Sequence, residues 1–160
     1  MREEYLQRLQ EAKKTAKSNQ KKIVKLKKMR KGSVDAVIHQ LHDAAFEKID
    51  CLECANCCKS TGPLFKQADI DRLAKHLRLS AAHFIEKYLR IDEDNDYVLQ
   101  SVPCTFLGSD NYCSVYEVRP KACREYPHTD RINQLGILKL TEKNINICPA
   151  VADIFQNIEL

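Results

Sequence analysis

Four cysteines within eight residues constrain this chain more than any other feature of its sequence. Residues 51–58 read Cys-Leu-Glu-Cys-Ala-Asn-Cys-Cys. Cys51, Cys54 and Cys57 are therefore spaced C-x2-C-x2-C, and Cys58 follows directly. The C-x2-C spacing lets two thiolates converge on one ion, because a tight turn brings their sulfur atoms together. Three such thiolates can also cover one face of an iron–sulfur cube, so the spacing indicates a thiolate–metal site without choosing between zinc and iron.

The other cysteines lie downstream and are further candidate ligands. An isolated cysteine is often a small buried hydrophobic residue, but four in a run with only Leu52 and Ala55 as apolar neighbours need another explanation. Eight thiols in all could serve two four-coordinate sites, or one cluster with additional structural thiols, and the spacing leaves both open. The expected cofactor is zinc or iron, the latter as an ion or a [4Fe–4S] cluster. The predicted metal ligands are Cys51, Cys54, Cys57, Cys58, Cys104, Cys113, Cys123 and Cys148.

The rest of the sequence indicates the compartment. The N-terminus carries acids and no apolar core, so we expect no secretory signal. The uncharged apolar runs are a handful of residues long, which excludes a transmembrane helix and gives no reason to expect membrane contact. In a reducing compartment a cysteine set of this size is more typical of metal binding than of disulfides. We therefore expect a cytoplasmic protein.

Charge is distributed unevenly along the chain. Residues 1–31 hold twelve Lys or Arg and three Glu, a net charge of +9, whereas the remaining residues carry 14 bases and 19 acids, a net charge of −5. We expect a basic N-terminal helical arm over residues 1–49 and a cysteine-cluster metal-binding domain over residues 50–160. The bases of residues 1–31 predict either a solvated helix face or a contact with an acidic protein or a nucleic acid, and the first is favoured because no aromatic residues interleave the bases.

The arm has the periodicity of a long basic helix. Apolar or small residues recur at alternating spacings of four and three, at Tyr5, Leu9, Ala12, Ala16, Asn19, Ile23 and Leu26. Gly32 is predicted to end this helix in a left-handed conformation, and Ser33 to cap a second helix over about residues 34–49. The two helices would form a hairpin, or one long helix kinked at Gly32.

The body also contains helical and strand patterns. Helices are predicted over about 67–78 and over about 81–90 after Ser80, and a last short helix runs from Cys148-Pro149 to about Asn157. Strands are predicted over 97–102 and 135–140. The expected fold is mainly α with a few short strands, a small metal-stabilised cysteine-rich domain preceded by a long basic helix. Among the histidines, only His128 follows a cysteine element and is a candidate ligand.

Four separated elements resemble the YkgJ-type cysteine-cluster family, CxxCxxCC, whose domain is described as zinc- or iron-chelating. Residues 51–58 match its cluster, and Pro103-Cys104-Thr105-Phe106-Leu107 looks like its C-x-F-L element. Residues 113–127, Cys-Ser-Val-Tyr-Glu-Val-Arg-Pro-Lys-Ala-Cys-Arg-Glu-Tyr-Pro, look like its C-x-[I/V]-Y-x3-R-P-x2-C-R-x-Y-P element, and Cys148 is similar to its closing cysteine. Members often carry Gly where Ala55 stands, and this departure weakens any claim of a left-handed turn at that point.

The resemblance covers about residues 50–150 and implies metal chelation by the cysteines, but no established reaction. Flagellin lysine methylases are relatives with a similar cluster, so an enzymatic role stays open and no catalytic residue is assigned. Around the thiolates, Arg119 and Arg124 are predicted to donate hydrogen bonds, and Tyr116 and Tyr126 to pack beside the site or simply to form a loop core.

Three functions follow from these patterns. The first is a zinc- or iron-chelating protein. The second is an iron–sulfur protein with a redox or protein-modifying, methyltransferase-like activity. The third is a metal-stabilised interaction module that binds an acidic partner or RNA through its basic arm.

Overall fold

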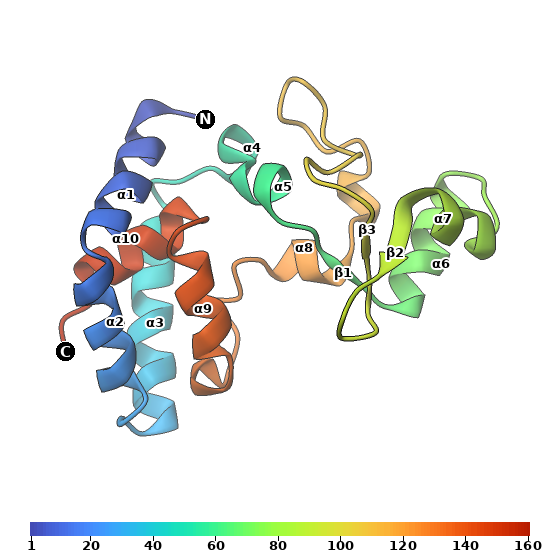
Figure 1. Ribbon diagram of the computed structural model, residues 1–160. Coiled ribbons are helices and arrows are strands. Elements are labelled where there is room, and N and C mark those ends of the chain that lie inside the picture. The colour runs from blue at the N-terminus through green and yellow to red at the C-terminus, as the bar shows by residue number, and fades with distance from the viewer. The chain divides into compact units, whose positions relative to one another are not determined.

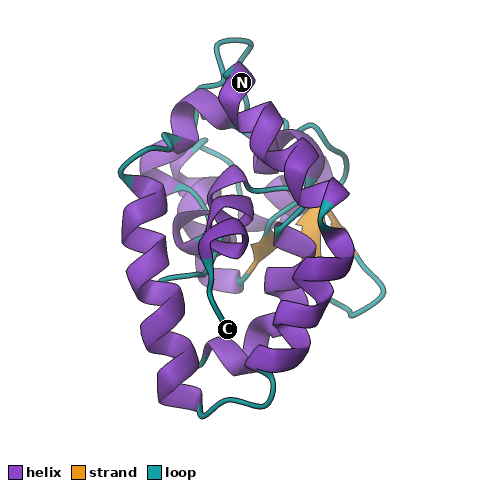
Figure 2. Ribbon diagram, turned by 90° about the vertical axis from the view of Figure 1, so that its left-hand side faces the viewer, coloured by secondary structure: helices purple, strands orange, loops and turns teal.

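Helices make up most of this chain, and its strands are few and short (Figure 1, Figure 2). The structure, a computed structural model, describes residues 1–160. It confirms a mainly α fold with a few short strands. No helix combines the length and the apolar character that a membrane crossing requires.

The chain divides into two compact units. Unit 1 comprises Met1–Asn56 and Pro127–Leu160, and unit 2 comprises Cys57–Tyr126. These two units are defined by which residues pack together in space. The division expected at residue 50 was instead based on the distribution of charge and cysteines along the sequence. That division, as a statement about a separate arm and a separate metal-binding domain, stays a prediction.

Unit 1 is built from helices that pack around α10 (Figure 1). Its elements are α1 (Glu3–Lys14), α2 (Ala16–Leu26), α3 (Lys31–Phe46), α4 (Cys51–Cys54), the 3₁₀ turn η2 (Gln134–Ile137), α9 (Leu138–Asn144) and α10 (Pro149–Asn157). Every residue of α10 from Pro149 to Phe155 is buried. Pro149 suits the first helical position because a missing N–H needs no partner there. The last helix expected from the sequence is therefore confirmed.

The apolar stripe of the arm packs inward, as predicted. Its buried members are Tyr5, Leu9, Ala12, Asn19, Ile23 and Leu26, and Ala16 is exposed. The arm is not one long helix, because α1 and α2 are separated at Thr15. The Thr15 Oγ1 donates to the carbonyl of Glu11 at 2.9 Å, and threonine side chains bonded back in this way bend helices.

Gly32 does not end the basic helix, which corrects the prediction. α2 stops at Leu26, and Gly32 lies in the first turn of α3 without a left-handed backbone. Ser33 therefore does not cap α3, whose N-cap residue is Arg30. Gly32 did not mark the helix end because residues 27–30 form the turn without a positive φ. The N–H groups of residues 27–29 bond back to carbonyls at the end of α2.

Unit 2 combines a small antiparallel sheet with α6 and α7. Its elements are α5 (Asn56–Ser60), β1 (Leu64–Phe65), α6 (Gln67–His76), α7 (Ala81–Tyr88), β2 (Leu89–Ile91), β3 (Tyr97–Leu99), η1 (Tyr116–Val118) and α8 (Lys121–Glu125). β3 lies between β1 and β2, so that Val98 pairs with both Leu64 and Arg90. The core of this unit contains Phe65, Ile70, Leu73, Ala74, Phe84, Leu89, Leu99, Phe106 and Val115.

Of the helices and strands predicted after residue 60, some are confirmed by the structure and one is not. α6 and α7 confirm the two helices, and the Ser80 hydroxyl accepts the N–H of His83 at 3.2 Å as the expected cap. The strand expected at 97–102 forms but ends at Leu99. The strand expected at 135–140 is wrong, because η2 and α9 occupy it. Leu138, Thr141 and Ile145 are buried at helical spacing, a period that the short apolar run alone does not reveal.

Candidate metal centre

The cysteine run forms two short helical turns joined by Ala55. The carboxylate of Asp50 caps α4 by accepting the N–H of Leu52 at 2.8 Å. Ala55 then adopts a left-handed conformation, with φ 48° and ψ 17°, and α5 starts directly after it. The left-handed turn therefore forms here with Ala55, although the departure from Gly had weakened the claim of such a turn.

Residues 50–56 are fixed within unit 1 by long-range contacts. The N–H of Asp50 donates to Tyr5 Oη at 3.0 Å, and Arg2 pairs with Glu53 at 2.7 Å. The Asn56 side chain donates to the carbonyl of Ile147 at 2.7 Å. The beginning of α1 and the residue before Cys148 therefore determine where the first cysteines of the run lie.

Three thiols of unit 1 form a first group, which we call group 1: Cys51, Cys54 and Cys148. Cys148 is buried at the N-cap position of α10, Cys54 is buried in α4, and Cys51 is exposed. Burial, together with negative charge on Cys51 and Cys54, raises the pKa of Cys148 to about 12. These three sulfur atoms are therefore within electrostatic reach of one another although their residues are almost a hundred positions apart.

Four thiols of unit 2 form a second group, which we call group 2: Cys58, Cys104, Cys113 and Cys123. The N–H of Cys104 donates to the carbonyl of Cys58 at 2.7 Å, and Leu107 pairs with Cys113 in an antiparallel bridge. These backbone contacts bring three segments of unit 2 together. The fourth cysteine lies in α8.

The pKa values of the group 2 thiols depend on burial and on the charge of neighbouring thiols. Burial, together with negative charge on Cys58, Cys104 and Cys113, raises the pKa of Cys123 to about 12. The pKa values of Cys104 and Cys113 are also raised, first by burial and then by charge on their neighbours, among them Cys58. Half-buried thiols whose charges repel one another resist ionisation unless a cation is present.

Cys58 differs from the other members of group 2. Its sulfur lies 3.9 Å from that of the adjacent Cys57. The hydrogen bond with Cys57 lowers the pKa of Cys58 to about 7, with help from the charge of Lys59, while burial opposes the shift. Cys58 is therefore the member of group 2 that ionises most readily near neutral pH.

The residues predicted to surround the cysteines of unit 2 have the following positions. Arg119 stacks on the ring of Tyr116, with its guanidinium carbon 3.7 Å from the ring centroid, and donates to the Tyr116 carbonyl at 2.6 Å. Its charge opposes the rise in the pKa of Cys113 and Cys123. Arg124 is exposed and donates to the Arg119 carbonyl at 3.1 Å, and Tyr126 is half-buried. Their roles beside a metal stay predictions.

Asp69 and Arg72 of α6 form a clamp that the sequence pattern does not indicate. The buried Asp69 carboxylate pairs with Arg72 at 2.6 Å and accepts the N–H of Lys121 at 3.0 Å. Arg72 also donates to the carbonyls of Val118 and Arg119, at 3.1 and 2.9 Å. The clamp thus fixes the segment that leads to Cys123. In the sequence, an Asp and an Arg three apart resemble an ordinary helix-surface pair.

No group of three or more His, Cys, Asp or Glu side chains stands in an arrangement that could hold a metal ion. The thiols of groups 1 and 2 are close enough to affect each other's pKa, yet they are not drawn together as ligands. His128 lies in unit 1, in a left-handed conformation, and its carbonyl accepts a hydrogen bond from Gln134 at 2.8 Å. Its expected role as a ligand stays a prediction.

Comparison with known proteins gives one match. The model of the CxxCxxCC family, described as "Putative zinc- or iron-chelating domain", matches residues 50–149. This range contains all eight cysteines and leaves out the α1–α3 arm. No curated protein and no solved structure matches.

Proposed function

Because this chain belongs to the CxxCxxCC family, we propose that it chelates zinc or iron through its cysteine thiolates, at group 1 and group 2 separately. The proposal is supported by the family match, which covers all eight cysteines, and by the electrostatic proximity of Cys58, Cys104, Cys113 and Cys123, which are not arranged as ligands in this structure. These thiols come from four separate segments of unit 2, and their charges act on one another. Four thiolates are a full ligand set for tetrahedral zinc or iron and for an iron–sulfur cluster.

The donor set suits a cation that displaces protons. A divalent ion stabilises thiolates that burial and mutual repulsion would otherwise keep protonated, so binding releases protons and contributes to folding free energy. The positive charge of Arg119, which already favours ionised Cys113 and Cys123, would offset part of the negative charge of four thiolates. The chemistry that the metal would supply here is charge neutralisation and cross-linking of four segments.

Group 1 would contribute a second site. Cys51, Cys54 and Cys148 supply three thiolates, and Cys57, which contacts Cys58, is the remaining thiol of the chain. We also propose a cytoplasmic location, because thiols that must stay reduced to bind metal persist in reducing compartments.

The test is the metal content of the full-length chain, purified without oxygen, in the wild type and in two double variants. Cys104→Ser/Cys113→Ser removes half of group 2, and Cys51→Ser/Cys54→Ser removes most of group 1. We expect each double variant to lose one portion of the metal and to keep the other, so that each serves as the control for its counterpart. Wild-type protein that contains no zinc or iron after loading with either ion would contradict the proposal.

Elemental analysis and absorption spectra of the same samples identify the bound metal. Colourless protein with zinc supports a structural or chelating role. Iron with an equal amount of sulfide and visible charge-transfer absorption supports an iron–sulfur cluster, and a redox or protein-modifying activity then becomes the function to assay.

A further inference from the structure

The helical arm of unit 1 carries cations without acids over a long stretch. Residues 12–34 contain nine Lys and one Arg and no Asp or Glu. We use the name basic face for the Lys and Arg residues of this stretch whose side chains are exposed and form no ion pair or other structural contact. The basic face consists of Lys13, Lys17, Lys21, Lys27, Lys28, Arg30 and Lys31.

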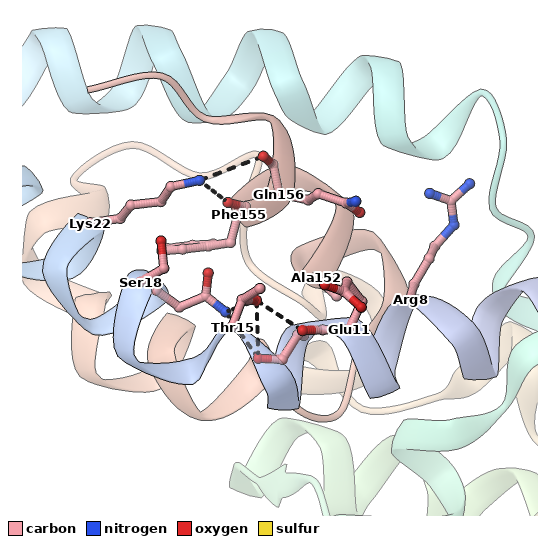
Figure 3. A pocket seen from close by; sticks show the side chains of 10 residues that line it. Arg8, Glu11, Thr15, Ser18, Lys22, Ala152, Phe155 and Gln156 are labelled. Atoms are coloured by element: carbon pink, nitrogen blue, oxygen red, sulfur yellow. Dashed lines mark hydrogen bonds between the residues drawn. The ribbon is translucent and has the colours of Figure 1, made fainter.

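The other three lysines of this stretch have structural contacts. Lys14 pairs with Glu11 at 3.5 Å. Lys22 donates to the carbonyl of Phe155 at 2.6 Å, across a cleft between α1, α2 and α10 (Figure 3). Lys25 donates to the carbonyl of Leu160 at 2.8 Å. Those contacts attach the arm to α10 and the segment after it, and none of them uses the basic face.

The basic face is not needed for the packing of the arm. α1 and α2 are anchored by their buried stripe and by contacts with α10, and no residue of the basic face is buried. Lys13, Lys17 and Lys21 follow one another at intervals of four residues, and like charges at that spacing destabilise a helix. A face that served only for solubility would gain stability from interleaved acids, and this one has none. The charge therefore points to an anionic partner.

We propose that the basic face binds the phosphate backbone of a nucleic acid duplex without sequence preference. Lysine is depleted in protein–protein interfaces, whereas phosphate contacts are typically made by Lys and Arg. The exposed part of the arm has no aromatic side chain on which single-stranded bases could stack. Val24, which is 43% exposed, is the only exposed large apolar side chain among residues 12–34, and one such side chain gives a lipid or an apolar protein surface little anchor.

The test is a fluorescence anisotropy titration of the full-length protein with labelled DNA and RNA duplexes of mixed sequence, repeated at several salt concentrations. We expect binding to both duplexes and an affinity that falls steeply as salt rises. Lys17→Gln/Lys21→Gln/Lys28→Gln should weaken binding at least tenfold and flatten the salt dependence by about one unit of slope for each lysine removed. These side chains have no partners in the folded chain, so the variant should keep the wild-type melting temperature.

The matched control removes the same charge from unit 2 with Lys75→Gln/Lys87→Gln/Arg90→Gln. This variant should bind like the wild type, and an equal loss in both variants would reduce the effect to net charge and overturn the proposal. Absence of binding at low salt would also overturn it. Competition with poly-glutamate or with vesicles of anionic lipid decides the class of partner. If either competes as well as an equal charge of duplex, the basic face is not a nucleic-acid surface.

Discussion

At the scale of single residues, Ala55 is held in a backbone conformation that L-amino acids avoid. Its φ of 48° places the Cβ close to the following carbonyl, a conformation that is unfavourable by about 1–2 kcal/mol for a residue other than Gly. Ala55 is 4% exposed and joins α4 to α5, so the surrounding structure fixes its backbone conformation. Hydrogen bonds from Asp50 to Tyr5 and from Asn56 to Ile147 hold the chain on either side of this turn.

Replacing this residue tests the strain directly. We expect Ala55→Gly to raise the free energy of unfolding by about 0.5–1 kcal/mol, because relief of strain exceeds the extra entropy that Gly gives the unfolded chain. Urea denaturation of metal-free protein measures the change. The matched control is Ala36→Gly on the exposed side of α3, which should lower stability by about 1 kcal/mol. A destabilised Ala55→Gly variant would show that the left-handed turn carries no strain.

At the scale of elements, α6 fixes the chain before Cys123 through one buried carboxylate. Burial alone would raise the pKa of Asp69, but hydrogen bonds from Arg72, Lys66 and Lys121 outweigh it and hold the pKa below its usual range. A carboxylate with a lowered folded-state pKa stabilises the fold above its unfolded pKa, near 4. That stability is lost as pH falls through the folded value.

We expect Asp69→Asn to lower the free energy of unfolding by about 1–3 kcal/mol at pH 7, since a charged hydrogen-bond acceptor becomes neutral. The difference from the wild type should shrink as pH falls from about 4 toward the lowered folded pKa of Asp69, because the unfolded chain binds a proton in that range before the folded carboxylate does. Denaturation curves at pH 7 and at the lowest pH where the wild type stays folded measure both effects. Asp71→Asn, on the exposed side of the same helix, should change stability by less than about 0.5 kcal/mol. A loss that is equal at both pH values would mean that the charge of Asp69 is not what matters.

The same elements show how far the sequence predicts this fold. The stripe from Tyr5 to Leu26, the Ser80 cap and the Cys148-Pro149 helix start are local signals, and the structure confirms them. The helix end predicted at Gly32 was wrong because a turn can form without a left-handed residue. The strand predicted at 135–140 was wrong because a short apolar run fits either a strand or a helix. The spacing and number of the eight cysteines were enough to predict them as candidate metal ligands. Their grouping was not, because it depends on contacts such as that between Cys104 and Cys58, which only tertiary packing creates.

At the scale of the whole molecule, the cysteine run contributes to both compact units. Cys51 and Cys54 belong to unit 1, and Cys57 and Cys58 to unit 2. Unit 1 adds Cys148 from its C-terminal helix, and unit 2 adds cysteines from its loops and from α8. Metal bound at each group would therefore cross-link segments that are distant in sequence, and its binding energy would add to the stability of that unit.

Proton release distinguishes group 2 from an accidental cluster of thiols. In the Cys51→Ser/Cys54→Ser background, zinc binding to four thiols should release about four protons at pH 6, where all four are protonated. At pH 8 it should release about three, because Cys58, with its pKa of about 7, is then mostly ionised, whereas the raised pKa values keep the other three protonated. Titration of metal-free protein with zinc in weakly buffered indicator solution counts the protons. Adding Cys58→Ser should give about three protons at both pH values, and an unchanged count of four at pH 6 in that variant would exclude Cys58 from the site.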